Sequence, residues 1–186
     1  MRDDIIAAAA RVFSQRGYHA ASMSEIADEV GIRKPSLYHH IRKKEDLLFE
    51  IHEQMIDELI ERTTIALQRS EAAEERIRRI LEVNMSFVAR HRDSVTVFLS
   101  ERHEMSGQRW DELVVKRDLY ERIVSGVVAA GTSSGEFIDV PPQITARALL
   151  AMANWGYTWF DPAGELSPEE VAEIFAEISL KGLLTR

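Results

Sequence analysis

The stretch SMSEIADEVGIRKPSLYHHIRKKEDLL, residues 22–48, decides the fold. Ser22 and Glu25 have the spacing of a capping box, which predicts that a helix begins at Ser22. Gly31 is expected to end this helix, because glycine readily adopts the left-handed backbone found at helix ends. Pro35 then fits the first turn of a short helix, where its missing N–H costs nothing. The order of helix, glycine turn and short polar helix predicts a helix-turn-helix.

The rest of the chain has the same helical character. Apolar residues recur at intervals of three and four, the helical period, and strand-like alternation is scarce. We therefore expect an all-α protein of about nine helices. Their expected ranges are 3–16, 22–30, 34–41, 44–70, 73–90, 94–105, 108–130, 141–159 and 167–184. Residues 131–135 and 161–164 are rich in glycine or turn residues and are expected to be loops.

Composition limits the class of protein. The chain has 186 residues, 45% of them hydrophobic, which is enough to bury a sizeable core. Cysteine is absent, which excludes disulfides, thiol nucleophiles and thiolate metal sites. Asp3, Asp4 and the early Arg11 do not fit a signal peptide, and no apolar run could span a bilayer. We expect a cytoplasmic protein without a membrane partner.

The charge is unevenly distributed. Residues 1–50 carry 8 Lys or Arg and 8 Asp or Glu, so they net zero, whereas residues 51–186 carry 15 and 23, which gives the whole net charge of −8. Five cations without an acid lie together near the predicted turn, and they are Arg33, Lys34, Arg42, Lys43 and Lys44. Such a cluster favours contact with nucleic-acid phosphates. The alternative is a solvated basic turn with no ligand.

The segment around the predicted turn resembles the DNA-binding domain of the TetR family. The resemblance covers about residues 5–50 and rests on Ile26-Ala27, Gly31, Ser36-Leu37-Tyr38, His39-His40 and Lys44-Glu45 followed by Leu47, with Phe13, Gly17 and Tyr18 before them. The departures from the family pattern are Val30 before the turn glycine, Arg33 at the expected helix cap, Ile41 in place of phenylalanine, and Lys43. None of them disturbs the packing expected of a helix-turn-helix.

The resemblance implies a domain organisation and a function. Residues 1–46 would form the DNA-binding domain, and residues 47–186 a helical domain that binds an effector and forms a homodimer. The protein would be a repressor that a small hydrophobic or acyl-CoA-type ligand releases from a palindromic operator, without a cofactor. The acyl-CoA class is suggested by an aromatic-rich helix that ends in Asp161-Pro-Ala-Gly164.

The resemblance also implies which residues contact DNA. Lys34, Ser36 and His39 would contact bases, Tyr38, His40 and Lys44 would contact phosphates, and Met23 and Ser24 would offer a backbone amide, with Arg33 and Pro35 completing the set. Tyr38 could instead pack between domains. His39 and His40 are poor partners for a metal, because neighbouring residues on a helix point about 100° apart, and no metal site is expected.

The effector domain contains all three tryptophans. Trp155 and Trp159 are four residues apart and share a helix face. The candidate ligand-binding residues are Met85, Val88, Phe98, Arg102, Trp110, Trp155 and Trp159, with Phe87 and His103 as possible neighbours. The alternative for each is a place in the core or in the dimer interface. The apolar stripes expected to form that interface are Ile144, Ala148, Leu149 and Met152 on one helix, and Val171, Ile174, Phe175, Ile178 and Leu183 on the next.

Other classes of function are less well supported. The sequence has no nucleophile elbow, phosphate-binding glycine loop or zinc-binding helix, so we do not expect an enzyme. A helical protein-interaction module would share the fold, but it has no need of the basic segment. An activator of the same fold remains an open alternative, because the sign of regulation leaves no trace in the sequence.

Overall fold

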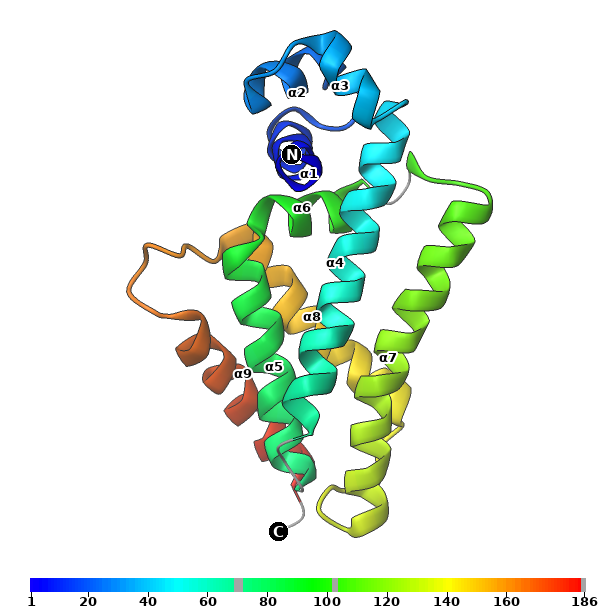
Figure 1. Ribbon diagram of the computed structural model, residues 1–186. Coiled ribbons are helices and arrows are strands. Elements are labelled where there is room, and N and C mark those ends of the chain that lie inside the picture. The colour runs from blue at the N-terminus through cyan, green and yellow to red at the C-terminus, as the bar shows by residue number, and fades with distance from the viewer. Residues whose placement is uncertain (69–71, 102–103, 185–186) are drawn as a thin grey trace. The chain divides into compact units, whose positions relative to one another are not determined.

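The computed structural model describes residues 1–68, 72–101 and 104–184, and over these ranges the chain is α-helical (Figure 1). The nine helices within these described ranges are α1 (Arg2–Arg16), α2 (Met23–Val30), α3 (Lys34–His40), α4 (Lys44–Leu67), α5 (Ala73–Arg90), α6 (Arg92–Ser100), α7 (Gln108–Ser134), α8 (Pro142–Trp159) and α9 (Pro168–Leu183). This confirms the predicted all-α class. None of the described helices has the length and hydropathy needed to cross a bilayer.

The chain divides into two compact units. Unit 1 consists of residues 1–57 and 91–114, and unit 2 consists of residues 58–90 and 115–186. The predicted helix-turn-helix lies within unit 1, which also contains α6 and the first turns of α7. The predicted functional boundary between residues 46 and 47 falls inside α4, and that division of roles stays a prediction.

In unit 1, α1 is the helix around which its neighbours pack. It contacts α2 and α6, and it buries seven residues, among them Ile5 and Phe13. Gly17 ends the helix with a φ of 79°, a positive value that favours glycine.

The helix-turn-helix follows the local signals of the sequence. The Glu25 amide donates to Ser22 Oγ at 3.2 Å, and the Ser22 amide donates to Glu25 Oε2 at 2.8 Å, which completes the predicted capping box. Gly31 adopts the left-handed conformation (φ 79°, ψ 29°) at the end of α2. α3 begins at Lys34 and ends one residue earlier than expected, because Ile41 is extended.

In unit 2, α5 packs against α8 and α9, which also contact each other. Arg78 of α5 ties this arrangement together, because its guanidinium bonds Glu177 at 3.0 Å and also pairs with Glu173, both on α9. The N-terminus of α9 has a capping box, in which the Glu170 amide donates to Ser167 Oγ at 3.2 Å.

A buried polar cluster joins three helices of unit 2. The Asn84 amide donates to the Tyr120 hydroxyl at 2.6 Å, and Thr63 Oγ1 lies 3.4 Å from the same hydroxyl. All three residues are buried. Burial raises the pKa of Tyr120 to about 12, although the two hydrogen bonds lower it. The hydroxyl therefore stays protonated well above the usual titration range of tyrosine.

The end of α7 differs from the prediction. Residues 131–135 were expected to form a loop, but the helix continues to Ser134 and ends at Gly135, where φ is 80°. Gly131 lies inside the helix, and the Phe137 ring packs directly on it. A Cβ at residue 131 would lie 2.4 Å from the Phe137 ring and 2.8 Å from the Ala73 Cβ. The glycine serves close packing and does not end the helix.

α6 is also placed differently from the predicted range 94–105. It runs from Arg92 to Ser100, so it begins earlier and ends sooner. The Ser100 hydroxyl donates to the Thr96 carbonyl at 2.7 Å, so a backbone acceptor in the last turn of the helix is hydrogen-bonded by a side chain. Met105, which continued the apolar period in the sequence, is buried in a non-helical segment.

We expect Gly131→Ala to destabilise the protein by about 1–3 kcal/mol, because the added methyl group would overlap the Phe137 ring. Gly126→Ala is the matched control, since nothing lies within 4 Å of a Cβ at that position of the same helix. It should stabilise the protein by up to about 1 kcal/mol. Thermal unfolding of both variants checks this. Equal effects would show that the contact with Phe137 is unimportant.

We expect Tyr120→Phe to lower the free energy of unfolding by about 1–3 kcal/mol at neutral pH, because the buried Asn84 amide loses its acceptor. The unaltered protein should also lose stability as the pH rises from 10 to 12. The unfolded tyrosine ionises near its ordinary pKa of 10.0, while the folded one, with a pKa of about 12, keeps its proton.

Denaturant unfolding at pH 7, 10 and 11.5 measures both effects. The Tyr120→Phe variant should lack this component of the alkaline loss, whereas Tyr157→Phe, at a half-buried site on α8, should retain it. Identical alkaline behaviour of the unaltered protein and Tyr120→Phe would contradict the prediction.

Candidate nucleic-acid interface

α3 exposes nearly all of its side chains. Only Leu37 of its seven residues is buried, and Ile41, which follows the helix, is buried as well. Tyr38 exposes 45% of its surface, so it is not part of the core of unit 1. The exposed residues at and beside the helix are Arg33, Lys34, Pro35, Tyr38, His39 and His40, while Ser36 is half-buried. A short helix with polar side chains on its free faces suits the DNA major groove.

The cations around α3 are available to a ligand. In the part of the chain that the structure describes, Arg33, Lys34, Arg42 and Lys43 form no ion pair, and all four are exposed. Three other arginines of unit 1, Arg2, Arg11 and Arg109, are paired with carboxylates. Arg11 pairs with Glu29 at 2.7 Å. The end of unit 1 that carries α3 is therefore positively charged, as the basic cluster in the sequence predicts.

The start of α2 offers backbone N–H groups. Ser22 caps the Glu25 amide, which leaves the amides of Met23 and Ser24 outside the cap. The Met23 side chain is buried and Ser24 is half-buried. Any contact of these two residues with a phosphate would therefore come from the backbone at the positive end of the helix.

Lys44 differs from the expectation of a phosphate contact. Its ammonium donates to the carbonyls of Tyr18 at 2.7 Å, His19 at 3.2 Å and Ala21 at 2.9 Å. It also lies 4.5 Å from the centre of the Tyr18 ring. An ammonium has three hydrogens, so this geometry leaves none for a phosphate. Lys44 is an internal donor in this structure.

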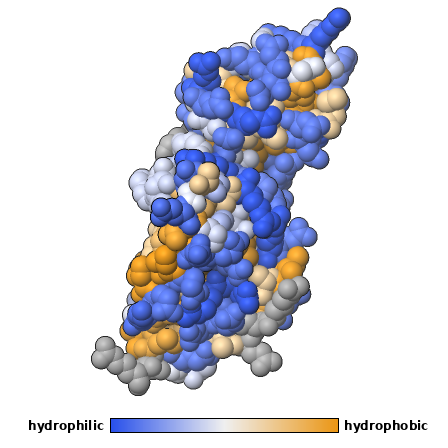
Figure 2. Space-filling model, turned by 90° about the vertical axis from the view of Figure 1, so that its left-hand side faces the viewer, coloured by the Kyte–Doolittle hydropathy of each residue, from blue (hydrophilic) through white to orange (hydrophobic). Residues whose placement is uncertain are grey.

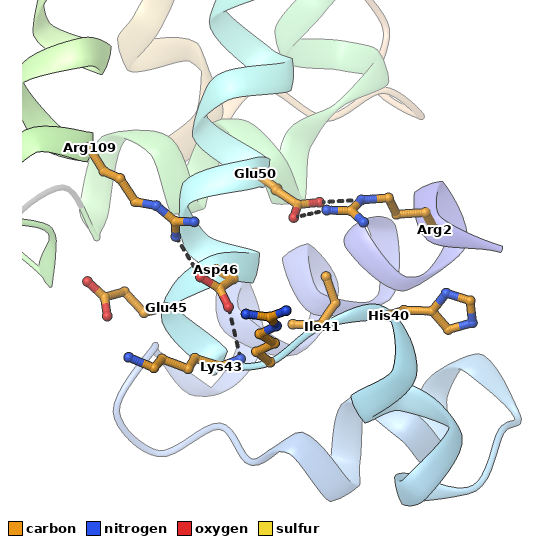
Figure 3. A pocket seen from close by; sticks show the side chains of 9 residues that line it. Arg2, His40, Ile41, Lys43, Glu45, Asp46, Glu50 and Arg109 are labelled. Carbon is orange, nitrogen blue, oxygen red and sulfur yellow. Dashed lines mark hydrogen bonds and ion pairs between the residues drawn. The ribbon is translucent and has the colours of Figure 1, made fainter.

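Ion pairs hold the start of α4 in place. Asp46 accepts the Lys43 amide at 3.0 Å and pairs with Arg109 at 2.6 Å, while Arg2 pairs with Glu50 (Figure 3). These groups line an open cleft of about 670 Å³ beside the α3–α4 connection. Within this cleft Glu50 neutralises Arg2 and Asp46 neutralises Arg109, and these pairs help to fix the backbone at the start of α4.

The predicted effector residues do not form one cluster within either unit. Phe98 and Trp110 belong to unit 1, where Phe98 is buried against the His52 ring. Met85 and Val88 are buried in unit 2 beneath Gly156 of α8. Phe87 is buried too, and Arg102 and His103 lie outside the described residues.

The two tryptophans of α8 lie at the surface. Trp155 exposes 64% of its area and Trp159 exposes 49%, so within this chain they do not line an enclosed cavity. Trp159 packs edge-on against Phe175 of α9, with ring centres 6.2 Å apart. The shared face predicted from their spacing is correct, but it points outward, since no described element of unit 2 covers it.

In the sequence, Arg42 and Lys43 belong to the basic cluster but were not predicted as individual DNA contacts, and no role was predicted for Asp46 or Arg109. The basic run and its position between α3 and α4 would have indicated Arg42 and Lys43 as candidates for contact with DNA. No local signal pointed to the Asp46–Arg109 pair, whose members are 63 residues apart. His39 and His40 belong to no group of three potential metal ligands in the described part of the chain.

Comparisons with known proteins agree with this geometry. Residues 5–51 match the family described as bacterial regulatory proteins, tetR family, and residues 70–183 match the tetracyclin repressor-like C-terminal domain. The repressor KstR2 of Rhodococcus jostii is 26% identical over 98% of this chain and 90% of its own length.

Solved structures give the same result. The ketosteroid regulator KstR2 of Mycobacterium tuberculosis superposes with a TM-score of 0.92 at 24% identity, covering 100% of this chain and 95% of that one. AibR, solved in complex with isovaleryl coenzyme A and operator DNA, has a TM-score of 0.86 at 30% identity over 95% of this chain and 96% of its own. The chain therefore belongs to the TetR family of DNA-binding transcriptional regulators.

Proposed function

We propose that the protein is a repressor that binds a palindromic operator as a homodimer and leaves it when an acyl-CoA thioester binds. The observation that carries the DNA-binding part is α3, a short helix that buries Leu37 and exposes its polar and basic residues. Members of the TetR family are regulators that bind operator DNA as dimers, respond to small molecules and are not enzymes. A regulator of this kind acts where the chromosome lies, in the bacterial cytoplasm.

The proposed contacts with DNA fall into two groups. Lys34, Ser36 and His39 would contact base edges, because they lie on the helix that fits the major groove. Contacts to the backbone would fix the register of the protein on DNA. The residues proposed for these contacts are Arg33, Pro35, Tyr38 and His40, with the amides of Met23 and Ser24.

The proposed dimer interface is the exposed apolar face of α8 and α9. Hydrophobic patches interrupt the polar surface in the lower part of Figure 2, on the side of the molecule where α9 lies. The large hydrophobic residues exposed on these two helices are Ile144, Trp155, Trp159, Ile174 and Ile178. Leu149, Val171 and Leu183, expected in the same interface, are buried within unit 2. Two copies of the α8–α9 pair would bury the exposed members in a four-helix arrangement.

The proposed effector class rests on relatives. KstR2 is named as a transcriptional repressor, and AibR was solved with isovaleryl coenzyme A. Met85 and Val88 supply apolar surface in unit 2, and the buried cluster of Thr63, Asn84 and Tyr120 supplies polar groups among apolar neighbours. A few fixed polar groups in an apolar setting are typical of small-molecule sites. In this proposal Trp155 and Trp159 belong to the dimer face.

The ligand would act by shifting a conformational equilibrium. It must bind the form that releases DNA more tightly than the form that holds it, since only differential affinity can change populations. A coupling free energy of about 1–3 kcal/mol is typical of such systems.

We expect the protein to enrich one near-palindromic sequence from a random duplex pool at moderate salt, with half-sites about one helical turn apart. His39→Ala and Lys34→Ala should weaken binding to that operator by about 1–3 kcal/mol each if they contact bases. Arg122→Ala removes an exposed cation of α7 in unit 2 and should leave operator affinity unchanged. No enrichment by a folded dimer, with or without acyl-CoA, would instead support a protein-interaction module.

We expect saturating isovaleryl-CoA, or a longer acyl-CoA, to raise the unfolding temperature and to weaken operator binding by roughly 5- to 150-fold. Free coenzyme A and the free carboxylic acids are the controls, because each contains only part of the thioester. Fluorescence anisotropy of the labelled operator measures release. Operator affinity that stays constant at saturating ligand would rule out acyl-CoA as the effector.

A further inference from the structure

Lys44 occupies an unusual position for a cation. It is the first residue of α4, where the positive end of the helix dipole disfavours positive charge. Three carbonyl oxygens, from Tyr18, His19 and Ala21, compensate by converging on its ammonium. These residues precede Lys44 by 23 to 26 positions. We call Lys44 with these three carbonyls the Lys44 clamp.

The clamp fixes the connection between α1 and α2. The Tyr18 ring lies 4.5 Å from the Lys44 ammonium and packs edge-on against Phe13 of α1, with ring centres 5.4 Å apart. The Tyr18 amide also donates to Glu101 at 3.3 Å. Ser22, which caps α2, follows directly after the carbonyl of Ala21. The clamp therefore holds the beginning of α2 beside the beginning of α4, and α2 packs against α3.

Arg42 and Lys43 have the opposite environment. They lie between α3 and α4, where the buried Ile41 and the hydrogen bond from the Lys43 amide to Asp46 fix the backbone. In Figure 3 the Lys43 side chain extends away from Asp46. Both side chains are exposed, and among the described residues neither forms an ion pair. The two cations are thus held beside α3 on a fixed backbone with their charges free.

We propose that Lys44 is a positioning residue that does not touch DNA, and that Arg42 and Lys43 are the phosphate contacts of the α3–α4 connection. The assignment of Arg42 and Lys43 rests on the proposed function. The clamp itself is a property of the folded chain and holds with or without DNA.

Neighbouring lysines give a matched test. Lys43→Met and Lys44→Met remove the same charge at adjacent positions, and Arg42→Met and Arg122→Ala complete the set. Operator affinity is measured at five salt concentrations for each dimer. Thermal unfolding and hydrogen exchange of the amides of residues 17–22 are measured without DNA.

Lys43→Met and Arg42→Met should each make the slope of log affinity against log salt shallower by about 1.8, which is 0.9 for each phosphate in a dimer. Their unfolding temperatures should stay unchanged. Lys44→Met should lower the unfolding temperature and speed exchange at residues 17–22. The folded variant should bind the operator about tenfold more weakly with an unchanged salt slope, and Arg122→Ala should change nothing.

Two results would overturn the proposal. A shallower slope for Lys44→Met, equal to that of Lys43→Met, would make Lys44 a phosphate contact. Unchanged slopes for Arg42→Met and Lys43→Met would remove those residues from the interface. If Lys44→Met does not fold, Lys44→Gln replaces it, because its amide keeps two N–H donors. If the unaltered protein binds no DNA, the proposed function fails, and the stability and exchange measurements still decide the clamp.

Discussion

The DNA-binding surface depends on the packing of the buried Leu37 side chain. α3 has seven residues, fewer than an isolated helix needs for stability in water, so tertiary packing must hold it. Leu37 in the middle of the helix and Ile41 directly after it are buried, and they anchor the short element to unit 1. Because one leucine supplies the packing within the helix, the other side chains remain exposed for recognition. The packing of α2 against α3, the clamp at Lys44 and the ion pair between Asp46 and Arg109 all help to keep this small element in place.

Signals that act between neighbours in the chain predicted the fold well. The capping box at Ser22 and the turn at Gly31 depend on residues within a few positions, and the structure contains both. The end of α7 could not be predicted in this way. Gly131 and Gly135 look alike in the sequence, and only the packing of Phe137 against Gly131 distinguishes them. The apolar period also predicted that the α6 helix extends to residue 105. Met105 is buried, as that period requires, but it lies outside the helix.

The candidate site shows the same limit at the level of single charges. The basic run predicted a cationic surface, and Arg42 and Lys43 are exposed as that requires. The adjacent Lys44 has the same chemistry, but its surroundings come from carbonyls more than twenty residues away. The tryptophans of α8 are comparable. Their spacing predicted a shared face, whereas its direction depends on what covers it. The environments of Lys44 and of the two tryptophans therefore depend on residues far away in the sequence, which the local pattern does not contain.

The outward apolar face of α8 and α9 has a consequence for how the regulator responds to its own abundance. A single copy leaves Trp155 and Ile178 in water, so pairing is favoured by mass action. If only the pair presents two copies of α3 to a palindrome, the concentration of competent molecules rises with the square of the chain concentration when copies are scarce. Occupancy of an operator would then change more steeply with expression level than a monomer could achieve, and a small change in synthesis would have a large effect on its targets.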